Sequence, residues 1–172
     1  VKSFEAVATD EQFWTTLASP EVDNAVVALV PAGHEVPLDE DYLDDIATAF
    51  GQVVDSKSPY TSGHSARVAL YTDMIAEALG LSEPRRRWLR RGALLHDVGK
   101  LGVSNSVLDK AGALDRSEWD AVKLHAEYSE RILSRISAFA ELALVAGAHH
   151  ERLDGTGYPR GLKAEDINIE TR

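Results

Sequence analysis

The chain is organised around one stretch, Leu94-Leu95-His96-Asp97-Val98-Gly99-Lys100. A histidine and an aspartate stand side by side after an apolar run, and a lysine follows within one helical turn. An imidazole nitrogen and a carboxylate oxygen both ligate transition metals, and the two oxygens of a carboxylate can bridge two ions. Lys100 is a compact cation suited to a phosphate oxygen. Because a His-Asp pair is common by chance, its meaning depends on where the other histidines fall.

Length and composition restrict the kinds of site that the chain can hold. The 172 residues are enough for one domain with a full core. The absence of cysteine excludes disulfides, zinc-thiolate sites and thiol catalysis, so any metal must be held by His, Asp or Glu. No apolar run is long enough to span a membrane and no stretch resembles a signal peptide, so we expect a soluble cytoplasmic domain.

The charge of the chain is acidic but uneven. The formal net charge of −10 argues against non-specific binding to nucleic-acid polymers. Five arginines nevertheless lie just before the His-Asp pair: Arg85, Arg86, Arg87, Arg90 and Arg91. This run has two interpretations, a solvated helix face or a local positive field that attracts an anionic ligand.

The first 38 residues differ from the rest and are predicted to be an N-terminal extension or a linker from a preceding module. Thr9 is expected to cap a short helix, and residues 25–30 are expected to form a short strand or buried segment. His34 is interpreted as an ordinary surface residue. This part of the chain shows no pattern that points to chemistry.

From residue 39 onward, long helical patterns predict an all-α bundle. The expected helices cover about residues 39–54, 61–79, 83–96, 117–133 and 138–150. Ser82 is predicted to cap the third helix, and Ser117 with Asp120 to open the fourth. On the second helix the predicted inward face is Val68, Tyr71, Ile75 and Leu79, with His64 on the same side.

Five of the six histidines fall on the core-facing sides of four predicted helices: His64, His96, His125, His149 and His150. One buried histidine is usually only a hydrogen-bonded core residue, because a buried polar group must find a partner. Five converging histidines with an adjacent aspartate predict a metal site. Nitrogen and carboxylate ligands suit Fe, Mn, Co, Ni or Zn rather than Mg or Ca. Five histidines are too many for one ion, so we expect two ions bridged by Asp97.

Neighbouring residues of a helix do not face the same way, which constrains His149 and His150. Both can be ligands only where the helix frays or bends, and the alternative is one ligand and one supporting or substrate-contacting residue. Two close metal ions polarise a phosphoryl group and lower the pKa of a bridging water. The reaction class that follows is hydrolysis of a phosphate ester, without a Ser, Cys or Lys nucleophile.

At this point the chain resembles the HD-GYP domains, a bacterial subgroup of the HD phosphohydrolase superfamily. The resemblance covers about residues 40–172. It rests, in chain order, on His64, His96-Asp97 with Lys100, His125, His149-His150 and Gly157-Tyr158-Pro159. The run from His149 to Pro159 is close to the strongest signature of that family.

The resemblance implies a helical domain that hydrolyses cyclic di-GMP to the linear dinucleotide and then to GMP, with two or three metal ions that are usually iron or manganese. The implied metal ligands are His64, His96, Asp97, His125, His149 and His150, and the implied catalytic residues are Asp97 and Lys100. Lys100 would contact phosphate. The loop Gly157-Tyr158-Pro159 would contact substrate or a partner such as a GGDEF-type protein, although Tyr158-Pro159 also fits simple turn chemistry.

The sequence departs from the family pattern at two places. Tyr60 stands where members with three metal ions have a glutamate, so we expect two divalent ions. The family segment with a further metal-binding aspartate would begin near Arg172, and Asp166 is too early to match it. We therefore interpret residues 39–172 as an HD-GYP domain truncated at its C-terminal end, with its first metal site short of one ligand.

These departures keep two alternatives open. The domain could be a catalytically impaired module that binds a cyclic dinucleotide or a GGDEF-type partner in signalling. It could also be an enzyme for another cyclic dinucleotide or a nucleotide monophosphate. The arginine run does not separate these alternatives, because all of the ligands are anionic.

Overall fold

The computed structural model describes residues 7–31, 38–59 and 62–172, and this part of the chain is helical. Its only β-type pairing is an isolated antiparallel bridge between Asp154 and Lys163. The predicted all-α class is therefore confirmed. The chain divides into two compact units, Val1–Leu38 and Asp39–Arg172. Among the described helices, none is both long enough and apolar enough to cross a bilayer.

The described part of the first unit includes the short helices α2 (Glu11–Leu17) and α3 (Val22–Val27), and neither of them buries a residue. The predicted cap at Thr9 is wrong, because the Asp10 carboxylate accepts the hydrogen bonds from the first turn of α2. The predicted strand or buried segment over residues 25–30 is also wrong, since α3 covers its start. A short apolar run cannot by itself be told from a helical one. His34 lies outside the described residues.

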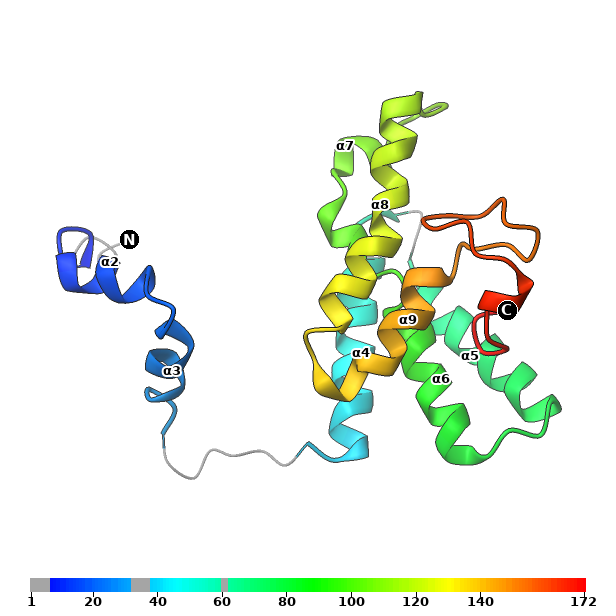
Figure 1. Cartoon of the computed structure of the whole chain (residues 1–172), viewed down its shortest axis with the longest axis horizontal. Coiled ribbons are helices and arrows are strands. Elements are labelled where there is room, and N and C mark those ends of the chain that lie inside the picture. Colours follow the sequence, from blue (N-terminus) through cyan, green and yellow to red (C-terminus); the bar gives the residue numbers. More distant parts are fainter. Residues whose placement is uncertain (1–6, 32–37, 60–61) are drawn as a thin grey trace. The chain divides into compact units, whose positions relative to one another are not determined.

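Among the described residues, the second unit carries α4 to α9 and the three short 3-10 helices η2, η3 and η4, of which η4 lies close to the C-terminus. In chain order they are α4 (Glu40–Asp55), α5 (His64–Ala78), α6 (Glu83–Leu95), η2 (Val98–Gly102), α7 (Asn105–Leu108), α8 (Arg116–Leu133), η3 (Ser137–Phe139), α9 (Ala140–Ala148) and η4 (Ala164–Asp166). Helix α6 packs against α4 and α5, and α8 packs against α9 and η2 (Figure 1).

Helix starts follow polar capping residues, although not always the expected ones. Ser82 is the N-cap residue of α6, as predicted. Helix α8 begins at Arg116, and its cap is not the predicted pair Ser117 and Asp120. Instead, Asp115 and Glu118 form a reciprocal capping box. In this arrangement each side chain satisfies a backbone N–H that the helix leaves free, which is why it prevails over the serine.

The core of the second unit lies where α4, α6, η2, α8 and α9 meet. Its buried residues are Leu43, Ala47, Val54, Leu95, Val98, Leu133, Phe139, Leu142, Ala143 and Ala146. Leu95 and Val98 flank the His-Asp pair and are each 2% exposed. Burial of these two neighbours places the pair at the edge of the core, away from bulk water.

Helix α5 buries a different face from the one that apolar spacing predicts. Tyr71, Ile75 and Leu79 are 58%, 61% and 63% exposed. The buried residues are small: Ser65, Ala69 and Ala76. Small side chains allow α5 to pack closely on α6, and the helix has apolar residues on both faces, so its periodicity could not decide which one turns inward. On α4 the large apolar residues Tyr42, Phe50 and Val53 are likewise exposed.

The arginine run of α6 forms ion pairs with the helices on both sides. Toward α5, Asp73 receives Arg86 Nη2 at 2.9 Å and Arg90 Nη1 at 2.7 Å. Hydrogen bonding to Arg86, and next to Arg90, lowers the pKa of Asp73 to about 2. The carboxylate is therefore charged at neutral pH and bridges two turns of α6 to α5.

Toward α4, Arg87 and Arg91 both pair with Asp44. The Arg91 side chain is only 7% exposed, and its Nη2 also donates to the carbonyl oxygen of Glu40 at 2.7 Å. Arg85 pairs with Glu170. Each arginine of the run thus has an acidic partner, so the run is a structural framework. It is neither a solvated face nor a free positive field.

The 3-10 helix η2 lies close against α8 at Gly99. Its backbone N–H donates to Ser129 Oγ at 2.9 Å. A Cβ atom at Gly99 would lie 2.0 Å from the carbonyl oxygen of His125 and 2.6 Å from the backbone nitrogen of Ser129. Only glycine fits between these backbones, so Gly99 allows η2 to lie directly on α8.

The substitution Gly99→Ala is expected to lower the free energy of unfolding by about 3 kcal/mol, because two backbones must separate to admit a methyl group. Chemical denaturation of purified protein measures this. The matched control is Gly80→Ala, where an added Cβ atom would meet nothing within 4 Å and the backbone φ is +75°. It should cost only about 1 kcal/mol of backbone strain. Equal losses for both variants would contradict the packing explanation.

Candidate metal centre

The structure brings all of the predicted metal-ligating residues together. His64 is the first residue of α5, His96 and Asp97 follow the last residue of α6, and His125 lies within α8. His149 and His150 follow α9. Ring centroids of neighbouring imidazoles lie 4.1–5.5 Å apart. Four helices, α5, α6, α8 and α9, therefore contribute to one cluster.

The cluster consists of two groups of three residues. One contains His64, His96 and Asp97, and the other contains His125, His149 and His150. Within each group the available ligand atoms all lie within 4.8 Å of one another. Such spacing suits atoms that share one ion, so each group could hold a metal.

Asp97 lies between the two groups and is 2% exposed. Its Oδ2 is 3.1 Å from His96 Nε2 and 3.7 Å from His64 Nε2. Its Oδ1 faces the other group, 3.3 Å from His125 Nε2 and 3.7 Å from His149 Nε2. Each carboxylate oxygen is thus directed at a different set of imidazoles, which is the arrangement that a bridging ligand requires.

One oxygen of this carboxylate indicates whether the residues of the cluster fit a metal ion. Within the described part of the chain, Asp97 Oδ1 is buried and has no hydrogen-bond partner. A buried carboxylate oxygen without a donor is costly. Imidazole nitrogens and a carboxylate oxygen that lacks a donor are the ligand set that transition metals prefer. The residues present therefore fit divalent metal ions.

The helices orient three of the imidazoles through their own backbone. The Nδ1 atoms lie 2.7, 2.6 and 2.5 Å from carbonyl oxygens three residues earlier, in the pairs His96–Ala93, His125–Val122 and His149–Ala146. A carbonyl can only accept, so Nδ1 carries the proton and Nε2 keeps its lone pair. In all three residues it is this Nε2 that faces Asp97.

The end of α9 explains how two adjacent histidines can serve one site. The helix ends at Ala148, and His149 is its C-cap residue. The two rings then lie 4.1 Å apart and belong to the same group. The helix therefore ends where the adjacent histidines need it to end. This arrangement favours both His149 and His150 as ligands over one ligand and one supporting residue.

The electrostatics keep His149, His150 and Asp97 in the protonation states that metals need. Burial, assisted by nearby imidazoles, lowers the pKa of His149 to about 3 and that of His150 to about 4. Both are therefore neutral at pH 7, as a ligating imidazole must be. Burial opposes the charge of Asp97, but His96 and Lys100 outweigh it and hold the pKa of this carboxyl well below its usual range.

Lys100 places a cation at the edge of the cluster. Its Nζ lies 2.6 Å from Asp97 Oδ2, and its side chain is 21% exposed. It is held there by η2, which turns the lysine back toward the aspartate three residues earlier. This half-buried ammonium group is well placed to bind an anionic group that enters from solvent.

The loop with Gly157, Tyr158 and Pro159 covers one side of the cluster. The Tyr158 ring stacks on the His150 imidazole with centroids 4.6 Å apart, and its backbone N–H donates to His150 O at 3.2 Å. A Cβ atom at Gly157 would lie 2.4 Å from the backbone nitrogen of Arg152. The glycine therefore lets the loop fold back onto the site, and Pro159 continues it through a cis peptide bond.

Two acidic residues that support the site were not assigned from the sequence. Glu151 follows the His149-His150 pair, and its carboxylate accepts hydrogen bonds from the backbone N–H groups of Arg160 at 2.7 Å and Leu162 at 2.9 Å. In the structure it holds the loop in place. Its proximity to the pair was the only sequence signal.

The second of these residues is Asp55, the last residue of α4, which is 8% exposed. It accepts hydrogen bonds from Ser65 Oγ at 2.7 Å and from Ser65 N at 3.1 Å. The N-cap residue of α5 is Gly63, which has no side chain to cap the helix. Asp55 thus supplies the missing acceptor from another helix, and it anchors the first turn that carries His64.

Tyr60, on which the prediction of two rather than three ions rests, lies outside the described residues. Asp166 lies in η4, where its carboxylate accepts a hydrogen bond from Lys163 N at 3.4 Å. It does not belong to either ligand group.

With this geometry established, the comparisons with known proteins assign the chain to a family. A model of the HD domain family matches residues 49–172, and the chain belongs to that family. The relatives it resembles confirm the predicted HD-GYP type. They are named as phosphodiesterases of cyclic dinucleotides.

One such relative is 3'3'-cGAMP-specific phosphodiesterase 3 of Vibrio cholerae, 54% identical over 172 residues, or 100% of this chain and 37% of the relative. A cyclic di-GMP phosphodiesterase of Thermotoga maritima is 38% identical over 135 residues, or 76% of this chain and 36% of the relative. A crystal structure of a cyclic GMP-AMP-specific phosphodiesterase of V. cholerae aligns with a TM-score of 0.53 and 54% identity, covering 85% of this chain and 35% of that one. The chain thus spans little more than a third of the length of these relatives.

The substitution Asp55→Asn is expected to weaken metal binding about tenfold, because a supporting residue that orients a ligand is lost. Titration of metal-depleted protein against a competing chelator measures the affinity, and circular dichroism checks that the helices remain. Asp45→Asn, an exposed acid on the same helix, is the matched control. Unchanged metal affinity in a folded Asp55→Asn variant would contradict the role of Asp55.

Proposed function

We propose that the protein containing this chain is a metal-dependent phosphodiesterase that hydrolyses a cyclic dinucleotide. The observation that carries the proposal is the position of Asp97, whose two oxygens face two separate histidine groups. Divalent ions bound there would supply the positive charge that polarises a phosphoryl group and lowers the pKa of a water molecule. The relatives named as cyclic dinucleotide phosphodiesterases support this assignment.

The proposed cofactor is a pair of divalent ions, iron or manganese. His64 and His96 would hold one ion, and the second would be held by the other group, His125, His149 and His150. Asp97 would serve both. Five imidazoles and one carboxylate favour these metals over Mg and Ca, which prefer oxygen ligands.

The protein's own residues would bind and orient the substrate. Lys100 would hold a phosphate oxygen, because its ammonium group lies beside the carboxylate between the two groups. The loop Gly157-Tyr158-Pro159 would border the bound nucleotide, since Tyr158 already stacks over His150. Burial raises the pKa of Tyr158 to about 12, so its phenol keeps its proton and can donate a hydrogen bond.

The substrates to consider first are 3'3'-cGAMP and cyclic di-GMP, which relatives are named for. The higher identity, over the whole chain, is with a 3'3'-cGAMP-specific relative, so we place that substrate first and cyclic di-GMP second. The products would be the linear dinucleotide, the mononucleotides or both. The net charge of −10 and the paired arginines of α6 favour a small anionic substrate over a nucleic-acid polymer.

The direct test is hydrolysis of both cyclic dinucleotides by the full-length protein loaded with Mn²⁺ or Fe²⁺, followed by chromatography of the products. We expect linear dinucleotide or mononucleotides, and no product from a His96→Ala variant. Metal-loaded protein that hydrolyses neither compound would refute the proposal. Tight binding without hydrolysis would instead support the impaired binding module.

Asp97→Ala is expected to remove metal from both groups, because its two oxygens serve both. His64→Ala should deplete only the group that contains it. Elemental analysis of protein purified without chelator measures metal per chain, and manganese or iron should predominate. Wild-type metal content in Asp97→Ala would show that the carboxylate does not bridge.

Lys100→Ala is expected to keep the metal content and to lower kcat/KM about a hundredfold, through loss of one charged contact to the reacting phosphate. Lys123→Ala is the matched control, because Lys123 Nζ also lies 2.6 Å from an aspartate three residues earlier, Asp120, but in the middle of α8. Loss of metal from the Lys100→Ala variant would contradict this division of roles.

A further inference from the structure

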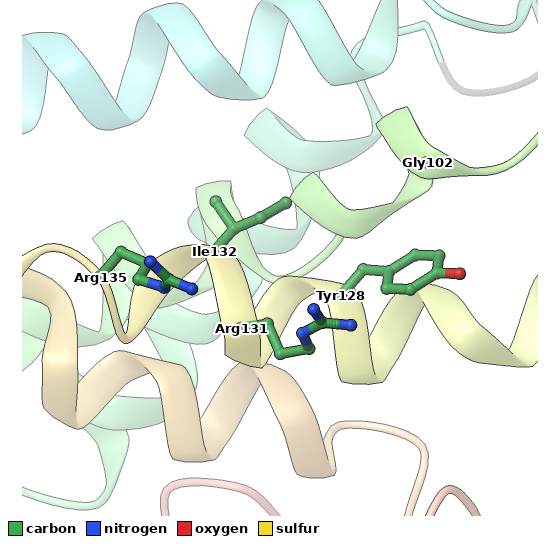
Figure 2. A pocket seen from close by; sticks show the side chains of 5 residues that line it. All are labelled: Gly102, Tyr128, Arg131, Ile132 and Arg135. Carbon is green, nitrogen blue, oxygen red and sulfur yellow. The ribbon is translucent and has the colours of Figure 1, made fainter. Parts of the chain in front are cut away.

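A pocket separate from the metal centre lies where the end of η2 meets α8. Its volume is about 530 Å³, and Gly102, Tyr128, Arg131, Ile132 and Arg135 line it (Figure 2). None of these is among the candidate metal ligands. The pocket nevertheless adjoins the centre along both elements, since Gly102 follows Lys100 by two residues and Tyr128 follows His125 by three.

The pocket carries positive charge that has no partner. Arg131 and Arg135 are exposed, and among the described residues neither side chain forms an ion pair or hydrogen bond. The arginines of α6, by contrast, all pair with acids. Two unpaired guanidinium groups one turn apart are unusual in a chain with a net charge of −10, because like charges at this spacing repel each other.

Helix electrostatics alone account for only part of this arrangement. A cation in the last turn of a helix is favourable, and Arg131 occupies that turn of α8. Arg135 lies beyond Leu133, where α8 ends. The dipole does not explain why apolar groups flank both arginines, and these groups are what distinguish a ligand pocket from a charged surface.

The apolar part of the pocket is an aromatic ring and an aliphatic side chain. The Tyr128 ring packs on Gly102, where a Cβ atom would lie 2.8 Å from the ring. Ile132 is 40% exposed and lies on the next turn of α8. The pocket therefore offers a flat ring, a branched side chain and two forked donors within one small volume.

These groups match the parts of a nucleotide. Guanidinium groups bind phosphate oxygens through paired hydrogen bonds, and a base stacks on an aromatic ring. The volume lies in the range of about 300–1,000 Å³ that is usual for small-molecule sites. We propose that this pocket binds a nucleoside monophosphate, with the phosphate on Arg131 and Arg135 and the base against Tyr128.

The pocket lies on the same two elements as part of the metal centre. Gly102 ends the η2 helix that holds Lys100 beside Asp97, and the Gly99 N–H binds Ser129 in α8. A nucleotide that lies against Gly102 and Tyr128 would touch the two elements that carry Lys100 and His125. The binding itself does not depend on the proposed phosphodiesterase activity and is measured without it.

The test is titration of GMP and AMP into the full chain after its metal has been removed with a chelator, followed by calorimetry. We expect saturable binding that weakens about tenfold or more in Arg131→Ala/Arg135→Ala, which removes two charged hydrogen-bonding groups. The matched control is Arg116→Ala, an exposed arginine at the other end of α8, which should leave the affinity unchanged. Circular dichroism confirms that each variant is folded.

Two further measurements separate a nucleotide site from a charged patch. Tyr128→Leu should weaken GMP binding and leave the binding of inorganic phosphate unchanged. The methyl resonances of Ile132 should shift when GMP is added. The proposal is overturned if GMP does not bind, if the double arginine variant binds it as well as the wild type does, or if inorganic phosphate binds as tightly as GMP.

Discussion

The second unit depends on the burial of one carboxylate. Asp97 sits at the edge of the core between Leu95 and Val98, where water cannot solvate its charge. A carboxylate in such a place is tolerated only when other groups compensate for the lost hydration. Here Lys100 and two sets of imidazoles lie around the carboxylate, and metal ions bound among them would complete that compensation. The fold and the site therefore both depend on compensation of this one buried charge.

The remaining structure keeps these groups in position from outside the cluster. Asp44 and Asp73 fasten α4 and α5 to the arginines of α6, which ends at the His-Asp pair. Asp55 anchors the start of α5, and Glu151 holds the loop that follows α9. Each of these contacts joins residues that are distant in sequence or separated by a turn. Polar pairing outside the core thus determines where the ligands lie.

The sequence predicts the helical class and the gathering of the histidines around Asp97, because both depend on local patterns. Short stretches of sequence already show His96 near the end of an apolar helical pattern. They also show the paired histidines before a turn-rich loop. The buried face of α5 was not predictable, since it depends on which neighbour the small residues Ser65, Ala69 and Ala76 can approach closely. The partners of the arginine run and the roles of Asp55 and Glu151 were missed for the same reason. They arise from contacts between segments that only the folded chain brings together.

The candidate metal ligands stand, with one exception, at the ends of helices. His64 begins α5, His96 and Asp97 follow α6, and the adjacent histidines follow α9, whereas His125 lies within α8. Helix ends are the parts of a helix that open most readily. Ions held among them would join four segments that could otherwise loosen independently. Metal occupancy would then govern the local dynamics of the domain as well as its chemistry, with α8 as the rigid element against which the others close.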